Sequence, residues 1–587
     1  MIEARFDDLT GASPSFALTE PVGVVEAMRT DEVLPARAAA EAGAARGLWV
    51  AGFVAYEAAP GFDPSLAVRR RADGDPFARL PLAWFAMFER REDSSLPEPR
   101  DGATDAPEAW KPSIERAVYA EAISRIRRNI AAGETYQINY TLRLRSQIQG
   151  NERGLYRDLC FAQRGGHAAY LNIGRYRICS ASPELFFQLD GTTITTKPMK
   201  GTAPRGRWPA EDDEQARCLV SSEKERAENA MIVDLLRSDL GRIARTGSVR
   251  WSEVFAAERY ETIWQLTSTV SAELGEGIGA PEVFAALFPS GSITGAPKVR
   301  SMEIIADLED APRGVYCGAV GYLAPPGAAG PRASFNVAIR TVLVDGETRA
   351  AEYGVGGGIT WDSSAGAEYE ETVAKARVLT QRRPPFDLLE TMRRDPGRPI
   401  HELGEHLERL SGSADYFGYR LDLEALRKGL AEAGAGAERP VRVRVRLPRD
   451  GRFEIAATHM DEGDGSPVLV EIDDDPVDPA DPMLFHKTSL RGRYEAAAAR
   501  HPDAGDVILV NSRGEVTEST IANLAARIDG TWCTPPLDCG LLPGTGRAAL
   551  IASRTFQERV ITVAELRGAG AIELISSTRG RRPAELR

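Results

Sequence analysis

The sequence predicts an α+β protein with more than one domain. At 587 residues the chain is too long for a single hydrophobic core, which favours two to four domains. Helical periodicity is clear over 113–133 and 223–244. Short strand-like runs occupy 192–199, 334–344, 441–447, 506–511 and 571–576. Helices and strands are mixed without the regular strand–helix–strand alternation of a doubly wound sheet, and no GxGxxG follows a strand.

Composition and charge exclude several classes of protein. Hydrophobic residues make up 43% of the chain and charged residues 27%, as in soluble globular proteins. The start, MIEARFDDLTGASPSF, lacks a signal-peptide pattern, and no apolar run is long enough to span a bilayer, so we expect no membrane contact. Six scattered cysteines without a CxxC indicate reduced thiols in a cytoplasmic enzyme. A net charge of −13 argues against nucleic acid as a partner, and sites for anionic substrates must be locally positive.

Two breaks in composition predict the domain boundaries. Residues 91–112 are charged, rich in proline and poor in apolar residues, which is typical of a linker. A helical run ends at QRRPPF, where two prolines cannot continue it, and a new α/β pattern follows. We therefore expect an N-terminal part over 1–110, a central domain over 113–380 and a C-terminal domain over 384–587, with no internal repeats.

Two pairs of glutamates are candidates for a metal site in the central domain. Glu225 and Glu228 are three residues apart in a helical pattern, and so are Glu368 and Glu371, so each pair shares one helix face. Four such carboxylates brought together would form a hard oxygen site suited to Mg²⁺. The alternative is a pair of solvated helix faces, because glutamate is common on helix surfaces.

Two further residues could act chemically. Lys200 lies in TKPMKGTAPRG, between a strand-like run and a Gly-Pro turn. A lysine there is either solvated or, if buried near apolar walls or other cations, a nucleophile. Glu184 lies in SASPELF at the head of a strand-like run, where it is either a loop carboxylate or an acid with a raised pKa.

Seven stretches of the central domain carry a family resemblance. In chain order they are GETYQINYT (133–141), SASPELF (180–186), TKPMKGTAPRG (196–206), EKERAENAMIVDLLRSDLGR (223–242), SGSITGAPKVRSMEII (290–305), NVAIRT (336–341) and GVGGGITWDSSAGAEYEET (354–372). Together they resemble the chorismate-utilising enzymes, which include anthranilate, aminodeoxychorismate, isochorismate and salicylate synthases. The segment GLWVAGFVAYEAAPGFD (47–63) is similar to the extra half of the aminating members. The resemblance implies an α/β-sandwich that binds chorismate.

Two positions separate the subfamilies. Relatives that add water to chorismate carry a lysine where this chain has Gln137, which cannot act as that base. Anthranilate synthases have alanine at the position of Lys200, whereas aminodeoxychorismate synthases have a lysine that attacks C2 as the C4 hydroxyl leaves. The resemblance therefore implies amination at C4. The chain has no glutaminase motif, so ammonia would come from solution or from a separate glutamine amidotransferase subunit.

The resemblance also implies roles for individual residues. Glu184 would be the general acid, while Glu228 and Glu371 would hold Mg²⁺ directly, with Glu225 and Glu368 nearby or acting through water. The implied substrate contacts are Gln137, Ser292, Lys298, Arg340, Gly356, Gly357 and Gly358. The chain departs from the family pattern at Gln265, where many relatives have histidine, and at Ser238, where asparagine is expected.

Five stretches of the C-terminal domain carry a second resemblance. They are FDLLETMR (386–393), HLERL (406–410), FHKTSLRGRYEAA (485–497), GEVTESTIANL (514–524) and GLLPGTGR (540–547). Each alone could be an ordinary loop, turn or surface segment. Together they resemble the fold-type IV pyridoxal-phosphate enzymes, which include branched-chain and D-amino-acid aminotransferases and aminodeoxychorismate lyase.

This second resemblance implies a pyridoxal 5'-phosphate site. Lys487 would form the Schiff base and move protons, and Glu518 would keep the pyridine nitrogen protonated so that the ring can accept electrons. The phosphate would be bound by Thr545, Gly546 and Arg409, with Ser577 and Thr578 of ISSTRG as further candidates. Thr391 would lie near the reacting atoms.

These motifs do not separate a lyase from a transaminase. A synthase on the same chain would make the substrate of the lyase, so we expect conversion of chorismate to 4-aminobenzoate and pyruvate, a route to folate. The alternatives are an anthranilate synthase fused to an aminotransferase, a synthase fused to a true transaminase, and a non-catalytic scaffold that binds an amidotransferase. Fold-type IV relatives are usually dimers, which favours a homodimer formed through the C-terminal domain.

Overall fold

The computed structural model describes residues 2–72, 74–96, 109–380, 384–460 and 465–587. They form two compact units: unit 1 comprises Met1–Pro204 and Ala216–Pro385, and unit 2 comprises Arg205–Gln215 and Phe386–Arg587. Much of the predicted linker (97–108) and the start of QRRPPF (381–383) lie outside the described residues. Of the helices that are described, none has the length and apolar character to cross a bilayer.

Unit 1 is built on strands that pair in one continuous antiparallel order. In chain order they are β1 (Glu3–Asp7), β2 (Phe16–Ala27), β3 (Trp49–Val54), β4 (Ala83–Asp93), β5 (Lys111–Pro112), β6 (Gln137–Gln147), β7 (His167–Asn172), β8 (Tyr176–Ser182), β9 (Leu185–Asp190), β10 (Thr193–Lys197), β11 (Met199–Pro204), β12 (Arg250–Arg259), β13 (Ile263–Glu273), β14 (Gly295–Ala296), β15 (Ala319–Leu323), β16 (Ala333–Val337), β17 (Thr341–Asp345) and β18 (Ala350–Ile359). The pairing runs β5–β6–β18–β17–β8–β7–β1–β2–β4–β3–β15–β16–β9–β10–β13. β14 also pairs with β6, and β11 and β12 pair with β13.

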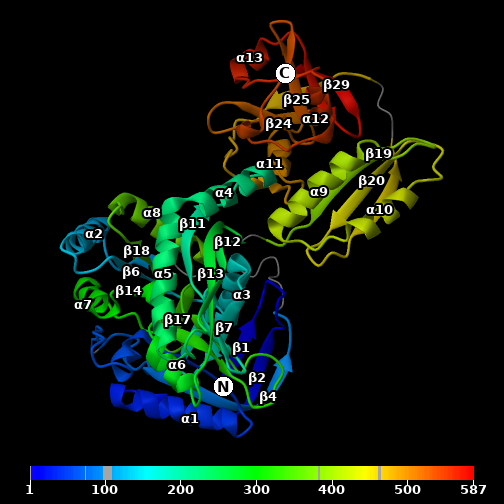
Figure 1. Ribbon diagram of the computed structural model, residues 1–587. Helices are drawn as coiled ribbons and strands as arrows, with labels where there is room; N and C mark the ends of the chain where they lie inside the picture. The colour runs from blue at the N-terminus through cyan, green and yellow to red at the C-terminus, as the bar shows by residue number, and fades with distance from the viewer. Residues whose placement is uncertain (1, 73, 97–108, 381–383, 461–464) are drawn as a thin grey trace. The chain divides into compact units, whose positions relative to one another are not determined.

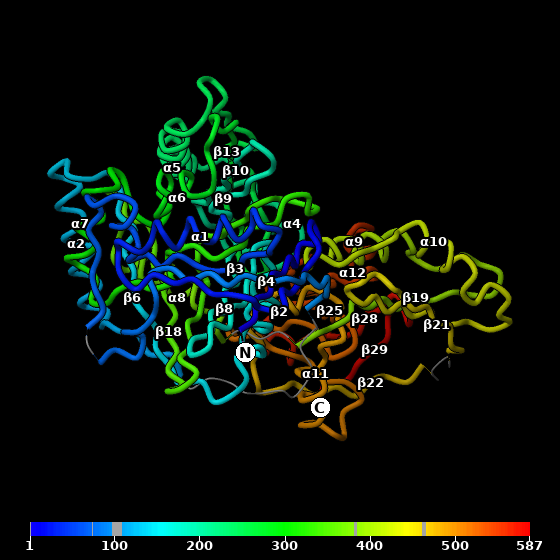
Figure 2. The backbone as a smooth tube through the Cα atoms, turned by 90° about the horizontal axis from the view of Figure 1, so that it is seen from below, coloured from blue at the N-terminus to red at the C-terminus, as the bar shows by residue number. Residues whose placement is uncertain are grey.

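Helices cover both outer faces of this folded sheet. They are α1 (Val33–Ala45), α2 (Arg116–Ala131), α3 (Glu152–Gln163), α5 (Glu223–Gly241), α6 (Ala280–Leu287), α7 (Lys298–Leu308) and α8 (Ala365–Ala376), with short 3-10 turns η1 (Thr30–Glu32), η2 (Tyr56–Gly61), η3 (Gly291–Ile293) and η4 (Arg377–Leu379). α4 (Pro209–Ser221) begins among the residues of unit 2 and ends among those of unit 1. In Figure 2 α1 runs along β3 and β4, which it contacts, and in Figure 1 α5 runs beside β11 and β13.

The alternation of side chains along β3 shows where the layers meet. Val50 and Val54 belong to the core beneath α1 and α6, whereas Trp49 and Phe53 belong to a separate core on the opposite face. That inner core also contains Ile178 of β8, from a distant part of the pairing order, so the sheet folds back on itself. A further core joins α2, α3 and α7 to β6, β8 and β18. Unit 1 is thus a sandwich of helix, sheet, sheet and helix.

One predicted strand is broken in the structure. The run 334–344 forms β16 and β17, which are separated at 338–340. Arg340 has φ 51°, in the left-handed region that a continuous strand cannot contain. This break allows Arg340 to line a cavity of unit 1. The predicted helices over 113–133 and 223–244 are present as α2 and α5.

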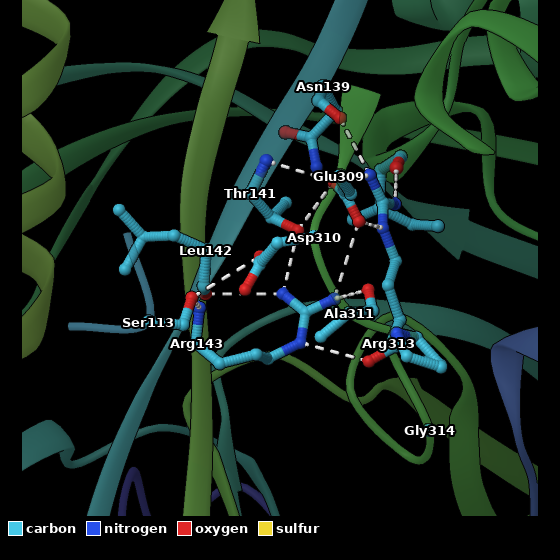
Figure 3. Close-up of polar contacts among 12 residues, drawn as sticks. Ser113, Asn139, Thr141, Leu142, Arg143, Glu309, Asp310, Ala311, Arg313 and Gly314 are labelled. Carbon is cyan, nitrogen blue, oxygen red and sulfur yellow. Dashed lines mark hydrogen bonds and ion pairs between the residues drawn. The ribbon is translucent and has the colours of Figure 1, made fainter. Parts of the chain in front are cut away.

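A buried carboxylate joins several segments of unit 1 (Figure 3). Glu309 accepts hydrogen bonds from the Thr141 hydroxyl at 2.6 Å, from Arg313 Nη2 at 2.7 Å and from Arg143 Nη2 at 3.3 Å. Arg313 in turn donates to the carbonyl oxygens of Ile293 at 2.6 Å and Asn139 at 2.7 Å. The Glu309 and Arg313 side chains are only 3% and 1% exposed, so this ion pair is shielded from water.

The strands of unit 2 form two sheets. Those of the first are β19 (Leu388–Arg394), β20 (Val441–Leu447) and β21 (Glu454–His459). Those of the second are β22 (Val468–Ile472), β23 (Asp506–Val510), β24 (Val516–Ser519), β25 (Asn523–Ile528), β26 (Thr531–Thr534), β27 (Gln557–Glu558), β28 (Ile572–Ser576) and β29 (Gly580–Leu586). The second sheet has the order β24-β23-β22-β29-β28-β25-β26-β27 and mixes parallel and antiparallel pairs.

The helices of unit 2 are α9 (Leu403–Phe417), α10 (Leu423–Glu432), α11 (Gly492–Arg500), α12 (Thr545–Ala552) and α13 (Val563–Arg567), with 3-10 turns η5 (Pro482–Leu484) and η6 (Leu537–Cys539). The first sheet shares a hydrophobic core with α9 and α10. Residues 205–215 complete this unit from a distant part of the sequence. Trp208 packs its ring 5.0 Å from that of Phe485, and Arg205 donates to the carbonyl oxygen of Tyr416 at 2.9 Å.

We predict that Glu309→Leu lowers the free energy of unfolding of unit 1 by about 3–5 kcal/mol, because it leaves two buried guanidinium groups without their counter-charge. The control is Glu134→Ala, which removes an ion pair between half-exposed side chains, Arg300 and Glu134, and should cost less than about 1 kcal/mol. Thermal and denaturant unfolding of both variants measure this difference. Equal small losses would show that the carboxylate is not needed for stability.

Candidate functional site

Unit 1 contains a polar cavity between β6, β11, β13, β18, α5, α8 and η3. The structure brings most of the predicted site residues of this unit to its wall: Glu184, Lys200, Glu225, Glu228, Ser292, Arg340, Gly356, Gly357, Gly358, Glu368 and Glu371. Gln137 and Lys298 are not among the residues that line it. Segments separated by more than a hundred residues of sequence therefore meet at one site.

The four glutamates reach the cavity from two helices, α5 and α8. Ser222 caps α5 and Ser364 caps α8, each by accepting a backbone N–H three residues ahead. Burial raises the pKa of Glu225, and the neighbouring Glu228 carboxylate raises it further. Burial likewise raises the pKa of Glu368. The cavity thus gathers negative charge, which favours a cation.

Lysine ammonium groups neutralise two of these carboxylates. Lys200 Nζ lies 2.9 Å from Glu228, and Lys375 Nζ lies 2.7 Å from Glu371. Among the residues that the structure describes, no three Asp, Glu, His or Cys side chains converge closely enough to hold a metal ion. The donor atoms are nevertheless all hard oxygens, the type that Mg²⁺ prefers.

Lys200 is fixed at the cavity wall by an ion pair. Burial alone would lower its pKa, but the carboxylates of Glu228, Glu371 and Glu368 together outweigh this effect and raise the pKa. Its ammonium group also lies 3.5 Å from the carbonyl oxygen of Gly358. A β carbon at Gly358 would stand 2.6 Å from Lys200 Nζ, so any larger residue here would displace the end of this lysine side chain from its present position. The surroundings are acidic, whereas the sequence suggested apolar walls or neighbouring cations.

Glu184 is held as a protonated acid near neutral pH. Burial raises the pKa of Glu184 to about 8, while a hydrogen bond from the Ser292 hydroxyl, at 2.6 Å, partly opposes this shift. A carboxyl group with such a pKa can give up a proton at physiological pH. Ser292, predicted as a substrate contact, thus also tunes this acid.

The remaining predicted residues differ in their placement. Arg340 lines the cavity and donates to Gln163 at 2.7 Å. Gln137 is buried, and its carboxamide makes no hydrogen bond with the described residues. The carboxamide lies next to Gly358, since its Nε2 atom would be 2.8 Å from a β carbon placed there. Gln265 lines the cavity and donates to the Gly201 carbonyl oxygen. Lys298 instead pairs with Asp239 at 2.9 Å, away from the cavity wall.

Unit 2 contains a second pocket, formed by β19 and β20 on one side and the second sheet with α12 on the other. Every predicted cofactor or reaction residue of this unit lines it: Thr391, Arg409, Lys487, Glu518, Thr545, Gly546, Ser577 and Thr578. Burial, together with the nearby Arg409 and Arg491 cations, lowers the pKa of Lys487 to about 8. A lysine with this pKa is partly neutral at physiological pH, as a Schiff-base lysine must be.

Glu518 faces the same pocket and is surrounded by donors. Burial raises the pKa of Glu518 to about 7, and the Tyr494 hydroxyl, which donates at 3.0 Å, moderates the shift. Asn523 Nδ2 and the Leu542 N–H each donate to the other carboxylate oxygen at 3.2 Å. These donors fix the orientation of the carboxylate toward the pocket.

Arg409 is positioned by a buried carboxylate behind it. Its Nη2 and Nε atoms donate to Glu390 at 2.7 and 2.8 Å, and His406 bonds to the same carboxylate at 2.7 Å. Burial would raise the pKa of Glu390, but Arg409 and His406 lower it to about 2. Arg409 Nη1 donates to the Pro543 carbonyl oxygen at 3.0 Å, which ties it to the loop before α12.

The loop at the start of α12 forms a close backbone cradle. Thr545 is the first residue of α12, where backbone N–H groups are free to bind an anion. A β carbon at Gly546 would approach the Ser577 nitrogen to 3.2 Å, so the two loops lie close together. With Arg409 and Thr578 on the same wall, this corner of the pocket has the chemistry of a phosphate site.

Sequence reasoning missed several residues of both sites: Lys375, Glu390, Arg444, Arg491 and Tyr494. Two of them left a signal in the sequence. Lys375 follows Glu371 by four residues, which is the spacing of an ion pair along a helix. Glu390 interrupts the apolar start of FDLLETMR, which is unusual for a buried strand. The others could be recognised only once the strands were placed.

Comparison with known proteins identifies the families. Residues 10–381, more than half of the chain, match the family model described as chorismate binding enzyme. The chain belongs to this family. Residues 387–586 match the model described as amino-transferase class IV. Both resemblances inferred from the motifs are therefore confirmed.

Curated relatives cover part of the chain. Aminodeoxychorismate synthase component 1 of Salmonella typhimurium is 41% identical over 273 residues, which cover 46% of this chain and 59% of that protein. Anthranilate synthase component 1 of Streptomyces coelicolor is 39% identical over 274 residues, covering 46% of this chain and 52% of that protein. The chain thus spans only a little over half the length of these relatives. Two relatives with different names are almost equally similar, so overall identity does not separate their activities.

A solved structure supports the fold of unit 1. Anthranilate synthase component I from Streptococcus pneumoniae aligns with a TM-score of 0.53 and 25% identity, covering 63% of this chain and 93% of that chain. The chorismate-binding part of the chain therefore has the anthranilate synthase component I-like fold, as the motifs predicted.

We predict that the rate at which acetic anhydride acetylates Lys487 in the cofactor-free protein rises with pH and is half-maximal near pH 8. Burial and two guanidinium groups disfavour the charged form of this amine and so lower its pKa. Arg491→Met removes one of those cations and should raise the midpoint, whereas Arg442→Met, a change outside the pocket, should leave it in place. Mass spectrometry of the peptide that carries Lys487 gives the rates. A midpoint near the ordinary lysine value of about 10.4 would refute the prediction.

Proposed function

We propose that this chain makes 4-aminobenzoate in two steps. Unit 1 converts chorismate and ammonia to 4-amino-4-deoxychorismate, and unit 2 eliminates pyruvate from that product. The observation that carries the proposal is the position of Lys200, at the wall of a cavity shared with a buried acid, Glu184, and four glutamates. In the family resemblance, a lysine at this position separates amination at C4 from amination at C2.

In the first step, Lys200 acts as the nucleophile. Its neutral amine forms a bond to C2 of chorismate, both conjugated ring double bonds shift, and the C4–O bond breaks, so that the hydroxyl leaves as water with the proton of Glu184. Ammonia then bonds to C4, the two double bonds shift back, and the bond between C2 and the lysine nitrogen breaks, which releases the lysine amine. Because Lys200 is ion-paired with Glu228, the proton that it carries must leave before the attack.

The glutamates of α5 and α8 supply the site for Mg²⁺. Glu228 and Glu371 would hold it most directly, and Glu225 and Glu368 would lie nearby or bind through water. Burial raises the pKa values of Glu225 and Glu368, and neighbouring carboxylates raise them further, so a divalent cation nearby would favour their charged forms. When bound, Mg²⁺ neutralises a substrate carboxylate. The substrate would further be held by Arg340, which lines the cavity and can bind a carboxylate through its guanidinium fork.

Ammonia is proposed to come from solution or from a separate glutamine amidotransferase subunit. No cysteine of the chain lies in the Gly-x-Cys-x-Gly turn of a glutaminase. Of the six cysteines, five are buried and only Cys218 is exposed. The name of the Salmonella relative, component 1, fits a protein that works with a second component.

In the second step, unit 2 is proposed to use pyridoxal 5'-phosphate, which supplies an electron sink when bound. Lys487 would attach the cofactor through its amine and would also carry a proton. Glu518 would hold the pyridine nitrogen, and the phosphate would be bound by Arg409, Thr545, Gly546, Ser577 and Thr578. Thr391 lies on the wall of the same pocket, where it can contact the substrate. The residues present fit this cofactor in charge and in donor type.

The decisive experiment is to incubate the purified full chain with chorismate, ammonium, Mg²⁺ and pyridoxal phosphate and to separate the aromatic products by chromatography. Formation of 4-aminobenzoate and pyruvate without an amino acceptor supports both steps. Formation of 2-aminobenzoate would identify an anthranilate synthase instead. A requirement for a 2-oxo acid would identify unit 2 as a transaminase.

We predict that Lys200→Ala abolishes formation of 4-amino-4-deoxychorismate while the absorbance of pyridoxal phosphate bound at Lys487 is unchanged, because the two sites lie in different units. Lys487→Ala should have the reverse effect and let 4-amino-4-deoxychorismate accumulate. Product chromatography and cofactor absorbance test both variants. Full output of 4-aminobenzoate from Lys200→Ala would rule out the lysine nucleophile.

We predict that in Ser292→Ala the fall of the amination rate at alkaline pH (the alkaline limb of the pH profile) occurs at a higher pH than in the unaltered protein. The hydrogen bond from Ser292 lowers the pKa of Glu184, so its loss raises that pKa above about 8 and the acid stays protonated further into the alkaline range. Thr202→Val removes a hydroxyl that bonds Gln265 and should leave the limb in place. The rates are measured at constant free ammonia. A limb that stays in place or moves to lower pH contradicts the assignment of Glu184.

A further inference from the structure

The pocket of unit 2 contains more positive charge than its cofactor requires. Three arginines line it, Arg409, Arg444 and Arg491, in a chain whose net charge is −13. Arg409 is already engaged by Glu390 and by the loop before α12. Two guanidinium groups, those of Arg444 and Arg491, therefore remain at the wall of this pocket for another anion.

Arg444 lies on the pocket-facing side of β20. The residues of this strand alternate between buried valines and exposed arginines, and Arg444 pairs in register with Thr391 of β19. Both line the pocket, whereas the buried valines face α9 and α10. Arg446, two residues along, is held by Asp387 at 2.6 Å. The side chain of Arg444 has no hydrogen-bond or ion-pair partner among the residues that the structure describes.

Arg491 approaches the pocket from the start of α11. Its Nη2 atom donates to the Thr520 carbonyl oxygen at 2.6 Å, and its guanidinium carbon lies 4.8 Å from the centre of the Tyr494 ring. These contacts hold the guanidinium without neutralising its charge. Arg491 is therefore a fixed cation, in contrast to the solvent-exposed Arg444.

We propose that Arg444 and Arg491 bind the two carboxylates of a dianionic amino substrate, which makes unit 2 selective for diacids. This inference rests on the proposed function, because 4-amino-4-deoxychorismate carries one carboxylate on its ring and another on its enolpyruvyl group. A guanidinium binds a carboxylate through two parallel hydrogen bonds. An amino acid with a single carboxylate would satisfy only one of the two arginines.

The first test measures binding without turnover. Isophthalate, with two carboxylates on a ring, and benzoate, with one, are titrated into the full chain loaded with pyridoxal phosphate, and cofactor fluorescence reports binding. The unaltered protein should bind isophthalate about tenfold more tightly than benzoate, since one charged hydrogen-bonded pair corresponds to roughly that factor. Arg444→Met and Arg491→Met should each remove this preference.

Arg442→Met is the matched control. Arg442 lies on the same face of β20, two residues from Arg444, and is likewise exposed, but it does not line the pocket. It should leave the preference for isophthalate unchanged. Equal binding of the two probes by the unaltered protein, or an equal loss in Arg442→Met and Arg444→Met, would overturn the inference.

The second test follows the reaction itself. With 4-amino-4-deoxychorismate as substrate, Arg444→Met should raise KM about tenfold and change kcat by less than about twofold, because the lost contact is equally present before and during the reaction. A large fall in kcat with KM unchanged would overturn the binding role. If the unaltered protein released no pyruvate but kept the preference for isophthalate, the lyase proposal would fail and the selectivity for diacids would stand.

Discussion

The carboxylate of Glu309 is the constraint on which the geometry of unit 1 depends. It lies between Arg143 and Arg313, and Arg313 reaches the carbonyl oxygens of Ile293 and Asn139, both on segments that line the cavity. The ion pair therefore fixes the position of η3 relative to β6. η3 carries Ser292, whose hydroxyl donates a hydrogen bond to Glu184. Such a shielded pair is tolerated only when all of its atoms are satisfied, as they are here.

Much of the fold and most of the site residues could be predicted from the sequence. Helical periodicity of apolar residues predicted α2 and α5. The family motifs predicted most of the residues that the structure places around the two pockets. What sequence reasoning could not supply were the partners across the fold. The acidic surroundings of Lys200 come from α5, and the carboxylate behind Arg409 comes from β19, so both depend on long-range packing. The break at Arg340 was also hidden, because a left-handed residue leaves no mark on hydrophobic alternation.

The two pockets handle charge in opposite ways. The cavity of unit 1 gathers glutamates and places lysines among them, so its titrating groups are coupled to one another. The pocket of unit 2 gathers arginines around a lysine, which lowers the pKa of the amine and leaves a surplus of positive charge. An acidic chain thus creates one environment suited to a cation and one suited to anions. Both arise locally, since the net charge alone would repel anionic substrates.

The assignment of residues 205–215 to unit 2 bears on how separable the two halves are. This segment follows the strand that carries Lys200, yet its Trp208 ring packs on Phe485 and its Arg205 bonds to Tyr416. Unit 2 is therefore discontinuous in sequence. A fragment that starts after residue 385 would expose an apolar ring and a carbonyl oxygen that the longer chain covers. The two units are thus not joined simply end to end, because residues 205–215, from the middle of the sequence of unit 1, complete unit 2.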